Sequence, residues 1–391
     1  MSDMQKKTKA KKEPLFVITK RAEMSFGKGL LIRIAALAAA LIVCGIVTLI
    51  LTKINPLVIF KTIVNGAVGN ETRILETVYQ TSILLIISVA VTPAFKMKFW
   101  NIGAEGQVIV GGLATAVTMY YVGNAFASML PAAADGSSVV LPAGLHILLI
   151  VIMAVAAIGA GALWGIIPAI FKSRWKTNET LFTLMMNYVA IQLTEAVRVT
   201  INKGGSGKVD SMILVHGWFP KLFGKEYLLD IIIVLAITAV IYVYLKYSKH
   251  GYEISVVGES ENTAKYVGIN VKKVIIRTMA LSGAICGLAG LLIVGGASHS
   301  LDKNMAGGRG FTAIMVSWLS KFNPIVMIFS SLFLIFLERG AKEVASAPGI
   351  GLNESFSEIL TGILLFFIIG CEFFINYRIT FRKHIKEVPA Q

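Results

Sequence analysis

Long apolar runs, separated by short polar segments, dominate the chain from about residue 30 to residue 377. Many of these runs reach the roughly 20 residues that an α-helix needs to cross the hydrocarbon core of a bilayer. The predicted fold class is therefore all-α, a polytopic membrane helix bundle. The pattern predicts about ten transmembrane helices, over residues 30–52, 74–95, 102–122, 145–171, 179–199, 227–246, 274–297, 310–320, 324–337 and 357–377.

Two of the predicted spans, 310–320 and 324–337, are short for a full crossing of the bilayer. The run Gly307-Gly308-Arg309-Gly310 precedes the first, and Asn323-Pro324 separates the two. We expect either two short helices or a re-entrant pair, and both keep the number of crossings even. Short segments interrupted by glycine or proline often mark the binding region of a transporter.

Composition supports a membrane protein and places much of its charge at the ends of the chain. Hydrophobic residues make up 55% of the 391 residues and charged residues only 15%, against about 25% charged in soluble domains. Much of the net charge of +15 lies in residues 1–29 and 378–391, so nucleic-acid binding is a poor interpretation. We expect one transmembrane domain, residues 30–377, between two basic tails that lie near anionic lipid.

The basic tails also predict the orientation. An even number of crossings puts both tails on one side of the membrane, and the positive-inside rule makes that side the cytosol. The basic residues of the loops alone do not decide the orientation. Residues 1–29 contain no apolar core followed by a small-residue cleavage site, so we predict a cytosolic tail rather than a cleaved signal.

A polar segment between the sixth and seventh predicted spans contains the signals of a short helix. Ser260 is a suitable N-cap, Gly268 suits a helix C-terminus, and Gly258 would end an extended stretch before the helix. The helix is too polar to span, so we expect it to lie along the cytosolic face with Ala264 and Ile269 available to a partner. The alternative is a solvated linker.

The most informative motif is Trp100-Asn101-Ile102-Gly103-Ala104-Glu105-Gly106-Gln107, at the start of the third predicted span. It combines a carboxylate and two amides with glycines, which let neighbouring backbones approach closely. An ionisable group at membrane depth is costly unless it has a partner or a polar cavity. The motif therefore predicts a tightly packed helix beside a polar path.

The fifth predicted span carries a second group of polar residues. Thr183, Asn187, Thr194 and Arg198 recur at helical spacing near one face. Glu195 lies one position from this face and is spaced to pair with Arg198. The stripe either lines a path or holds the bundle together by interhelical hydrogen bonds, and both roles stay open.

Several of these segments resemble one protein family. Residues 101–107 resemble the signature of ABC-importer permeases of the branched-chain amino acid, ribose and nucleoside superfamily, and Gly258 to Ile269 is similar to their coupling loop. The runs 178–190 and 310–314 resemble the simple-sugar and nucleoside branch, in which an Asn-Glu step, an Asn-Tyr step and a Gly-Phe helix start recur. The resemblance extends over about residues 30–377.

The resemblance implies a permease subunit in a bacterial cell membrane, and the basic tails predict that both its termini are cytosolic. Its implied partners are a cytosolic ABC ATPase pair, a second homologous permease and an extracytoplasmic substrate-binding lipoprotein. ATP hydrolysis is expected on the separate ATPase, so the chain itself is predicted not to be an enzyme. No cofactor is expected.

Two sets of functional residues follow. Nucleosides are neutral and polar, so their path needs amides, hydroxyls and aromatic surfaces rather than a fixed strong charge. The predicted substrate path comprises Asn101, Glu105, Gln107, Thr183, Asn187, Thr194 and Phe311. The predicted ATPase contacts, in a coupling loop at about 250–273, are Gly258, Glu259, Ala264, Tyr266, Gly268 and Ile269. Phe182 and Tyr188 are further stacking candidates, with ordinary packing as the alternative, and Glu105 would alternatively cap nearby amides.

The sequence thus predicts the translocating permease subunit of an ATP-driven importer for nucleosides. One alternative is an ABC permease for a simple sugar such as ribose. A second is an ion-coupled secondary transporter in which Glu105, Glu195 and Arg198 form an ion relay. A third is a membrane scaffold whose polar residues serve only packing.

Other signals are misleading. The run Gly204-Gly205-Ser206-Gly207-Lys208-Val209 lacks the first glycine and the Ser/Thr of a phosphate-binding loop, so nucleotide hydrolysis by this chain is not predicted. The five histidines are scattered along the chain and predict no metal site. The three cysteines lie in apolar runs, where packing is their expected role.

Overall fold

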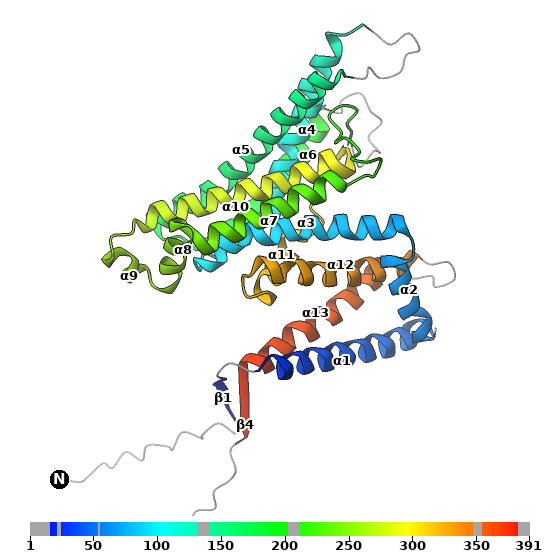
Figure 1. Ribbon diagram of the computed structural model, residues 1–391, viewed down its shortest axis with the longest axis vertical. Coiled ribbons are helices and arrows are strands. Elements are labelled where there is room, and N and C mark those ends of the chain that lie inside the picture. Colours follow the sequence, from blue (N-terminus) through cyan, green and yellow to red (C-terminus); the bar gives the residue numbers. More distant parts are fainter. Residues whose placement is uncertain are drawn as a thin grey trace, which may run out of the picture. The chain divides into compact units, whose positions relative to one another are not determined.

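The computed structural model describes residues 16–21, 25–53, 55–131, 141–201, 212–346 and 354–381. Their contacts divide into two compact units. One comprises the described residues of Met1–Ile63 and Ala341–Gln391, and the other is Val64–Gly340. Figure 1 shows helices throughout both units, as the all-α prediction requires.

The larger unit contains most of the bundle. Its helices are α3 (Glu71–Lys96), α4 (Ala104–Ser128), α5 (Ala143–Trp175), α6 (Glu179–Ile201), α7 (Leu228–Tyr247), α8 (Lys249–Glu259), α9 (Glu261–Tyr266), α10 (Val271–Ile293), the π-helical turn η1 (Val294–Ser298) and α11 (Arg309–Leu319). A two-residue antiparallel pairing joins β2 (Met212–Ile213) to β3 (Ser300–Leu301). Helices α2 (Pro56–Val68) and α12 (Pro324–Ser346) cross the boundary between the units.

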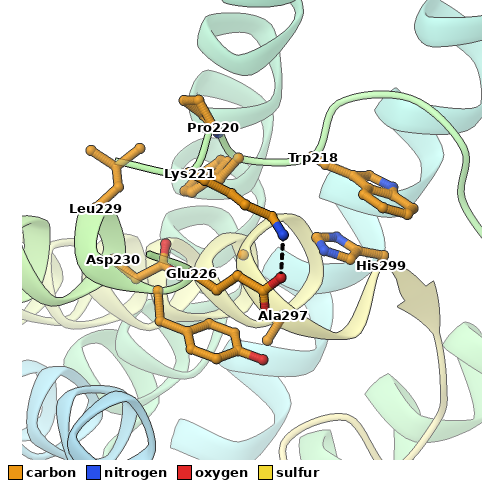
Figure 2. Close-up of a pocket in the computed structure, with 11 residues that line it drawn as sticks. Trp218, Pro220, Lys221, Glu226, Leu229, Asp230, Ala297 and His299 are labelled. Carbon is orange, nitrogen blue, oxygen red and sulfur yellow. Dashed lines mark hydrogen bonds and ion pairs between the residues drawn. The ribbon is translucent and has the colours of Figure 1, made fainter. Parts of the chain in front are cut away.

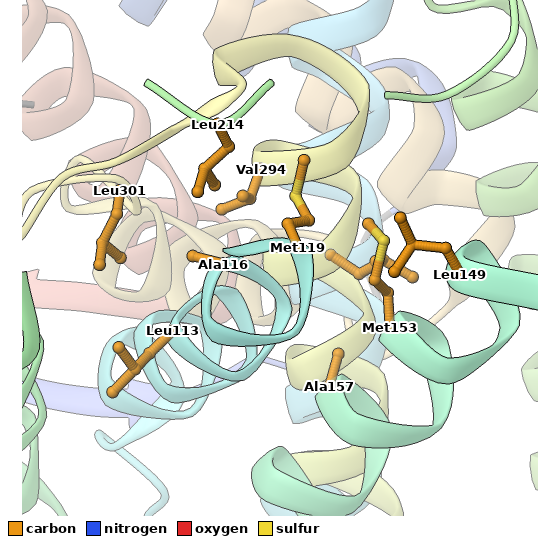
Figure 3. Close-up of a cluster of buried hydrophobic side chains, with 10 residues drawn as sticks. Leu113, Ala116, Met119, Leu149, Met153, Ala157, Leu214, Val294 and Leu301 are labelled. Carbon is orange, nitrogen blue, oxygen red and sulfur yellow. The ribbon is translucent and has the colours of Figure 1, made fainter. Parts of the chain in front are cut away.

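Glycines let α10 lie directly against α4 and α5. A Cβ atom added at Gly283 would lie 2.2 Å from the Gly161 carbonyl oxygen, and one added at Gly111 would lie 2.3 Å from the Gly287 Cα. These distances leave no room for a side chain, so the helix backbones touch. At the end with β2 and β3, apolar side chains from the three helices fill the space between them, including Met119, Leu149 and Met153 (Figure 3).

The smaller unit pairs the two ends of the described chain. Helix α1 (Phe26–Thr52) packs against α13 (Glu354–Asn376), and an ion pair of 2.6 Å joins Arg33 to Glu372. Strand β1 (Phe16–Lys20) runs antiparallel to β4 (Tyr377–Phe381). The two ends of the described chain therefore lie side by side.

The predicted spans correspond to helices, with two corrections. In the described part of the chain, eight helices are long and apolar enough to cross a membrane. The prediction of a short helix at 324–337 is wrong, because α12 continues to Ser346. Charged residues beyond position 337 are accommodated within the helix, and the Arg339 Nη2 atom lies 2.6 Å from the Glu76 carboxylate. The sequence reading also missed the 13-residue helix α2.

Candidate substrate path and coupling elements

Asn187 and Thr183, both predicted to line the path, hold α6 against the start of α4. The Asn187 Oδ1 atom accepts a hydrogen bond of 2.9 Å from the Gly106 N–H, and its Nδ2 atom donates one of 2.9 Å to the Ile102 carbonyl. The Thr183 hydroxyl accepts from the Ile102 N–H at 3.2 Å. Both polar side chains are buried. Their predicted one-sided stripe is confirmed, and it faces the bundle interior.

Asn101 and Gln107 form a second buried connection. Asn101 Oδ1 accepts from the Gly103 N–H at 3.0 Å, while its Nδ2 atom lies 3.4 Å from Gln107 Oε1 and from the Ser282 hydroxyl of α10. Thr194 is also fully buried and bonds to the carbonyl of Ala190 in its own helix. These contacts support a structural role, and a role in transport stays a prediction.

Glu105 joins two segments that are far apart in the sequence. Its Oε1 atom accepts a hydrogen bond of 2.8 Å from the Gly308 N–H, and its Oε2 atom accepts one of 2.7 Å from the Gly310 N–H. Both amides belong to the start of α11, where backbone N–H groups have no partner within the helix. A Cβ atom at Gly310 would lie 2.3 Å from the Glu105 nitrogen. The alternative expectation for Glu105, a carboxylate that caps nearby amides, is confirmed.

The contacts with α10 show how deep in the membrane the Glu105 cap on α11 lies. The continuous helical segment Val271–Ser298 is long enough to cross the membrane. Asn101 contacts this segment at Ser282, and Gly111 contacts it at Gly287. The motif between Asn101 and Gly111 therefore lies beside the middle of the α10 span.

The segment before α11 runs along α4 without forming a helix. Leu301 packs in the apolar cluster with Leu113 and Ala116, whereas Gly308 reaches Glu105, about 12 Å further along α4 at 1.5 Å per residue. Residues 301–308 therefore descend from the β2–β3 end of the bundle to mid-span. Gly308 takes a φ of +76°, which glycine adopts without strain.

Helix α11 completes this crossing. Near its end, the Ser317 hydroxyl lies 3.0 Å from that of Thr92, and the Trp318 ring stacks on Trp100 with centroids 5.4 Å apart. Both contacts are with the end of α3 and the α3–α4 turn. Residues 300–319 are therefore one discontinuous span, half non-helical and half helical, rather than one member of a re-entrant pair.

The non-helical half of this span, which precedes α11, carries polar groups that are exposed in the single subunit. Lys303, Asn304 and Gly307 are exposed, and the Arg309 guanidinium donates a hydrogen bond to the Gln80 side chain of α3. Non-helical backbone at membrane depth occurs only where protein covers it or where it lines a water-filled cavity. This surface is thus the stronger candidate path. The sequence reading noted the glycines but not these polar side chains.

The other predicted path residues lie apart from one another. Phe311 is 41% exposed in the first turn of α11, beside this surface. Glu195 pairs with Arg198 at 2.7 Å on α6, as their spacing predicted. Tyr188 is exposed, whereas the Phe182 ring packs against Phe171 with centroids 4.9 Å apart.

The expected coupling helix exists, but its surroundings differ from the expectation. The Ser260 hydroxyl caps α9 by accepting from the Thr263 N–H at 3.2 Å, and Gly268 takes a φ of +84° after the helix, as predicted. Ala264, however, is fully buried and is not available to a partner. Ile269 is half-buried. Tyr266 is the most exposed of the group, at 95%.

A second helix, α8, precedes α9 where an extended stretch was expected. Gly258 is buried within the last turn of α8, and a Cβ atom there would lie 2.1 Å from the Lys96 carbonyl oxygen of α3. Glu259, by contrast, is exposed. Figure 1 shows α8 and α9 at the end of the bundle where α7 and α10 meet. The extended-strand prediction is wrong because Ser248 caps a helix here, accepting from the Gly251 N–H at 3.0 Å.

An ion pair fixes α8 to α10. The Arg277 Nη2 atom lies 2.8 Å from Glu253 Oε2. This hydrogen bond, together with the positive charge of Arg277, holds the pKa of the Glu253 carboxyl below its usual value. A motion of α8 and α9 would therefore be transmitted to the long helix α10, which contacts α3, α4 and α5.

A polytopic bundle with a discontinuous, polar mid-membrane segment is the architecture of a membrane transport protein. Comparison with known proteins identifies the class more narrowly. Residues 73–369 match the family described as branched-chain amino acid transport system, permease component. The chain belongs to this family and is a multi-pass permease subunit of an ABC transporter.

Several relatives align over most of their length. The guanosine ABC transporter permease protein NupP of Bacillus subtilis is 30% identical over 310 residues, covering 78% of this chain and 83% of the relative. The glucose ABC transporter permease protein TsgB13 of Haloferax volcanii is 27% identical over 94% of each chain. The nucleoside ABC transporter permease protein NupB of Lactococcus lactis is 24% identical over 88% of this chain and 92% of the relative. No solved structure matches significantly.

Proposed function

We propose that this chain is the permease subunit of an ATP-driven importer for nucleosides. The observation that carries the proposal is the family match over residues 73–369 together with the relatives named as guanosine and nucleoside permeases. A glucose permease that aligns over 94% of the chain supports a sugar as the second candidate. In either case the solute is neutral and rich in hydrogen-bonding groups.

The polar surface at residues 302–309 is the proposed wall of the path. Lys303 and Asn304 would be costly against lipid, so they require water or protein beside them. A second permease subunit packed against this surface would enclose a polar passage. The buried residues Asn101, Asn187 and Glu105 would support that wall, because they fix the start of α4 to α10, α6 and α11 respectively.

The remaining proposals concern partners and orientation. A separate cytosolic ATPase would contact the exposed face of α8 and α9, chiefly Tyr266 and Glu259, and its closure would move α10 through the Glu253–Arg277 pair. A binding lipoprotein would deliver the solute at the opposite end. Both termini, which belong to the basic tails, would lie in the bacterial cytosol.

Uptake by the assembled transporter tests this function. Cells that express the chain with its ATPase, second permease and binding protein should accumulate radiolabelled nucleoside, and an ATPase-dead partner should abolish the accumulation. Uptake should survive an uncoupler while ATP is maintained. Accumulation of glucose or ribose but of no nucleoside would favour the sugar alternative, and uptake that needs no ATPase would refute both.

A further inference from the structure

A small pocket opens at the β2–β3 end of the bundle, opposite α8 and α9. It has a volume of about 210 Å³ and lies between the segment before α7, the first turn of α7 and the π-helical turn η1 (Figure 2). At about 30 Å³ per water molecule, it has room for one ring system. Turns of π-helix occur frequently at functional sites.

One side of the pocket is a fixed aromatic surface. The Trp218 indole stacks on the His299 imidazole with centroids 4.1 Å apart and planes 8° from parallel. The indole Nε1–H donates a hydrogen bond of 2.7 Å to the Leu214 carbonyl, and a ring nitrogen of His146 lies 2.8 Å from the Trp218 carbonyl oxygen. Trp218 remains 46% exposed. His299 covers one face of the indole, so the ring is held in place and only its remaining surface is open to a ligand.

A buried carboxylate forms the floor. Asp230 is only 1% exposed, and among the described residues its Oδ1 atom has no hydrogen-bond partner. A Cβ atom at Gly296 would lie 2.3 Å from Asp230 Oδ2, so glycine at this position leaves space for the carboxylate. A buried carboxylate oxygen without a donor is costly. A ligand with N–H groups would supply the missing hydrogen bonds.

The charges of the lining restrict the class of ligand. Lys221, at the rim, is paired with Glu226 (Figure 2), so it is not free to bind a phosphate. The carboxylate of Asp230 repels anions. The pocket therefore suits a neutral, flat ring that stacks on an indole and donates hydrogen bonds to a carboxylate.

We propose that this pocket is a binding site for the base of a purine nucleoside, in which the ring stacks on Trp218 and its N–H groups donate to Asp230. The proposal rests on the proposed nucleoside function and adds the site and the selectivity. Guanine presents a ring N–H beside an exocyclic amino group and can donate two hydrogen bonds to one carboxylate. Adenine has no ring N–H on that edge. The site therefore prefers guanosine to adenosine.

Nucleoside binding by the full-length wild-type chain in nanodiscs tests the site before any variant is made. Guanosine should bind more tightly than adenosine, by about tenfold or more, because a site built around a hydrogen bond rejects ligands that lack the donor. Equal affinity for the two nucleosides would overturn the role of Asp230. Binding of ribose or glucose with no binding of guanosine would overturn the ligand class.

Variants then test the two residues separately. Asp230→Asn should weaken guanosine binding by about tenfold and leave adenosine nearly unchanged, while Trp218→Leu should weaken both by about tenfold, since stacking on an aromatic ring tolerates any base. Glu261→Gln and Trp175→Leu are matched controls, because both native residues are exposed and outside the pocket. These controls should bind as the wild type does.

Gly296→Ala gives an independent check that keeps both binding groups. The added methyl group would displace the Asp230 carboxylate, so guanosine affinity should fall while stacking on Trp218 persists. Wild-type guanosine affinity in Asp230→Asn and Trp218→Leu would refute this site and leave the transport function intact. Absence of nucleoside uptake by the complete wild-type transporter would refute the function itself, whatever the pocket binds.

Discussion

At the scale of single residues, the polar groups at the start of α4 serve to join helices. Asn187 uses both ends of its amide on α4 backbone groups, and Asn101 and Glu105 each satisfy groups on other segments. A buried polar group without a partner costs more than a hydrogen bond contributes, so these residues are sensitive to small changes. Their burial and their hydrogen bonds give these residues a structural role, and their predicted role in the substrate path stays a prediction.

The cap on α11 gives a prediction at this scale. Glu105→Gln replaces one acceptor oxygen by an NH₂ group, so one of the two α11 amides loses its partner and the free energy of unfolding should fall by about 1–3 kcal/mol. Thermal unfolding in detergent would measure the loss. Glu261→Gln, at an exposed position on the same bundle, should leave the melting temperature unchanged. An unchanged melting temperature in Glu105→Gln would contradict the cap.

At the scale of elements, the connection between α8 and the rest of the bundle determines whether motion can be passed on. Gly258 lets α8 lie against the end of α3, and the Glu253–Arg277 pair joins it to α10. Helix α9, by contrast, exposes Tyr266 and Val267 at its end. The pair of short helices thus has one face fixed to the bundle and one face free for a partner.

The close contact of α8 and α3 gives a second prediction. Gly258→Ala adds a methyl group 2.1 Å from the Lys96 carbonyl oxygen, which should displace α8 and destabilise the protein by about 1–3 kcal/mol, as overpacking usually does. Uptake should fall even where the protein is still inserted in the membrane. Gly159→Ala is the control, since a Cβ atom there meets nothing within 4 Å. Equal uptake in both variants would count against the contact.

The Glu253–Arg277 pair predicts a dependence on pH. The pKa of Glu253 is lower in the folded state than its usual value because of the Arg277 hydrogen bond. The carboxyl therefore stabilises the fold at neutral pH, and the contribution disappears as the pH falls through the folded-state pKa. Glu253→Gln should melt below the wild type at pH 7, and the difference should shrink on acidification. A difference that stays constant with pH would exclude the ion pair as its cause.

At the scale of the whole molecule, the arrangement of the ends supports an even number of crossings. Strands β1 and β4 pair over five residues each, which is possible only if both ends lie on one side. An even number that includes the discontinuous span at 300–319 then requires α6 to cross as well, in addition to the eight described helices that are long and apolar enough. The number of crossings therefore depends on a segment that is only half helical.

Accessibility of single cysteines would check the orientation. The three native cysteines are buried, so background labelling should be low. Tyr266→Cys, at a position 95% exposed, should react with a membrane-impermeant thiol reagent only after the cells are permeabilised. Phe223→Cys, at a position 89% exposed before α7, should react in intact cells. The reverse pattern would place the α8–α9 end outside and remove the basis for ATPase coupling.

The sequence by itself determined the class of protein and most of the spans, because these are local properties. A run of about 20 apolar residues crosses a bilayer whatever its neighbours are, and Ser260 and Gly268 delimit α9 through backbone groups a few residues away. The family signature at residues 101–107 is equally local, and the match over residues 73–369 confirmed it.

The tertiary structure alone decided which polar residues are buried and paired and which are exposed. Glu105 and Gly308 are 203 residues apart in the chain, and no spacing rule connects them. Ala264 is buried, and Trp218 meets His299, only because segments from distant parts of the sequence pack together. Burial and pairing are properties of the packed bundle, so a polar residue in an apolar run shows its role only once its neighbours in space are known.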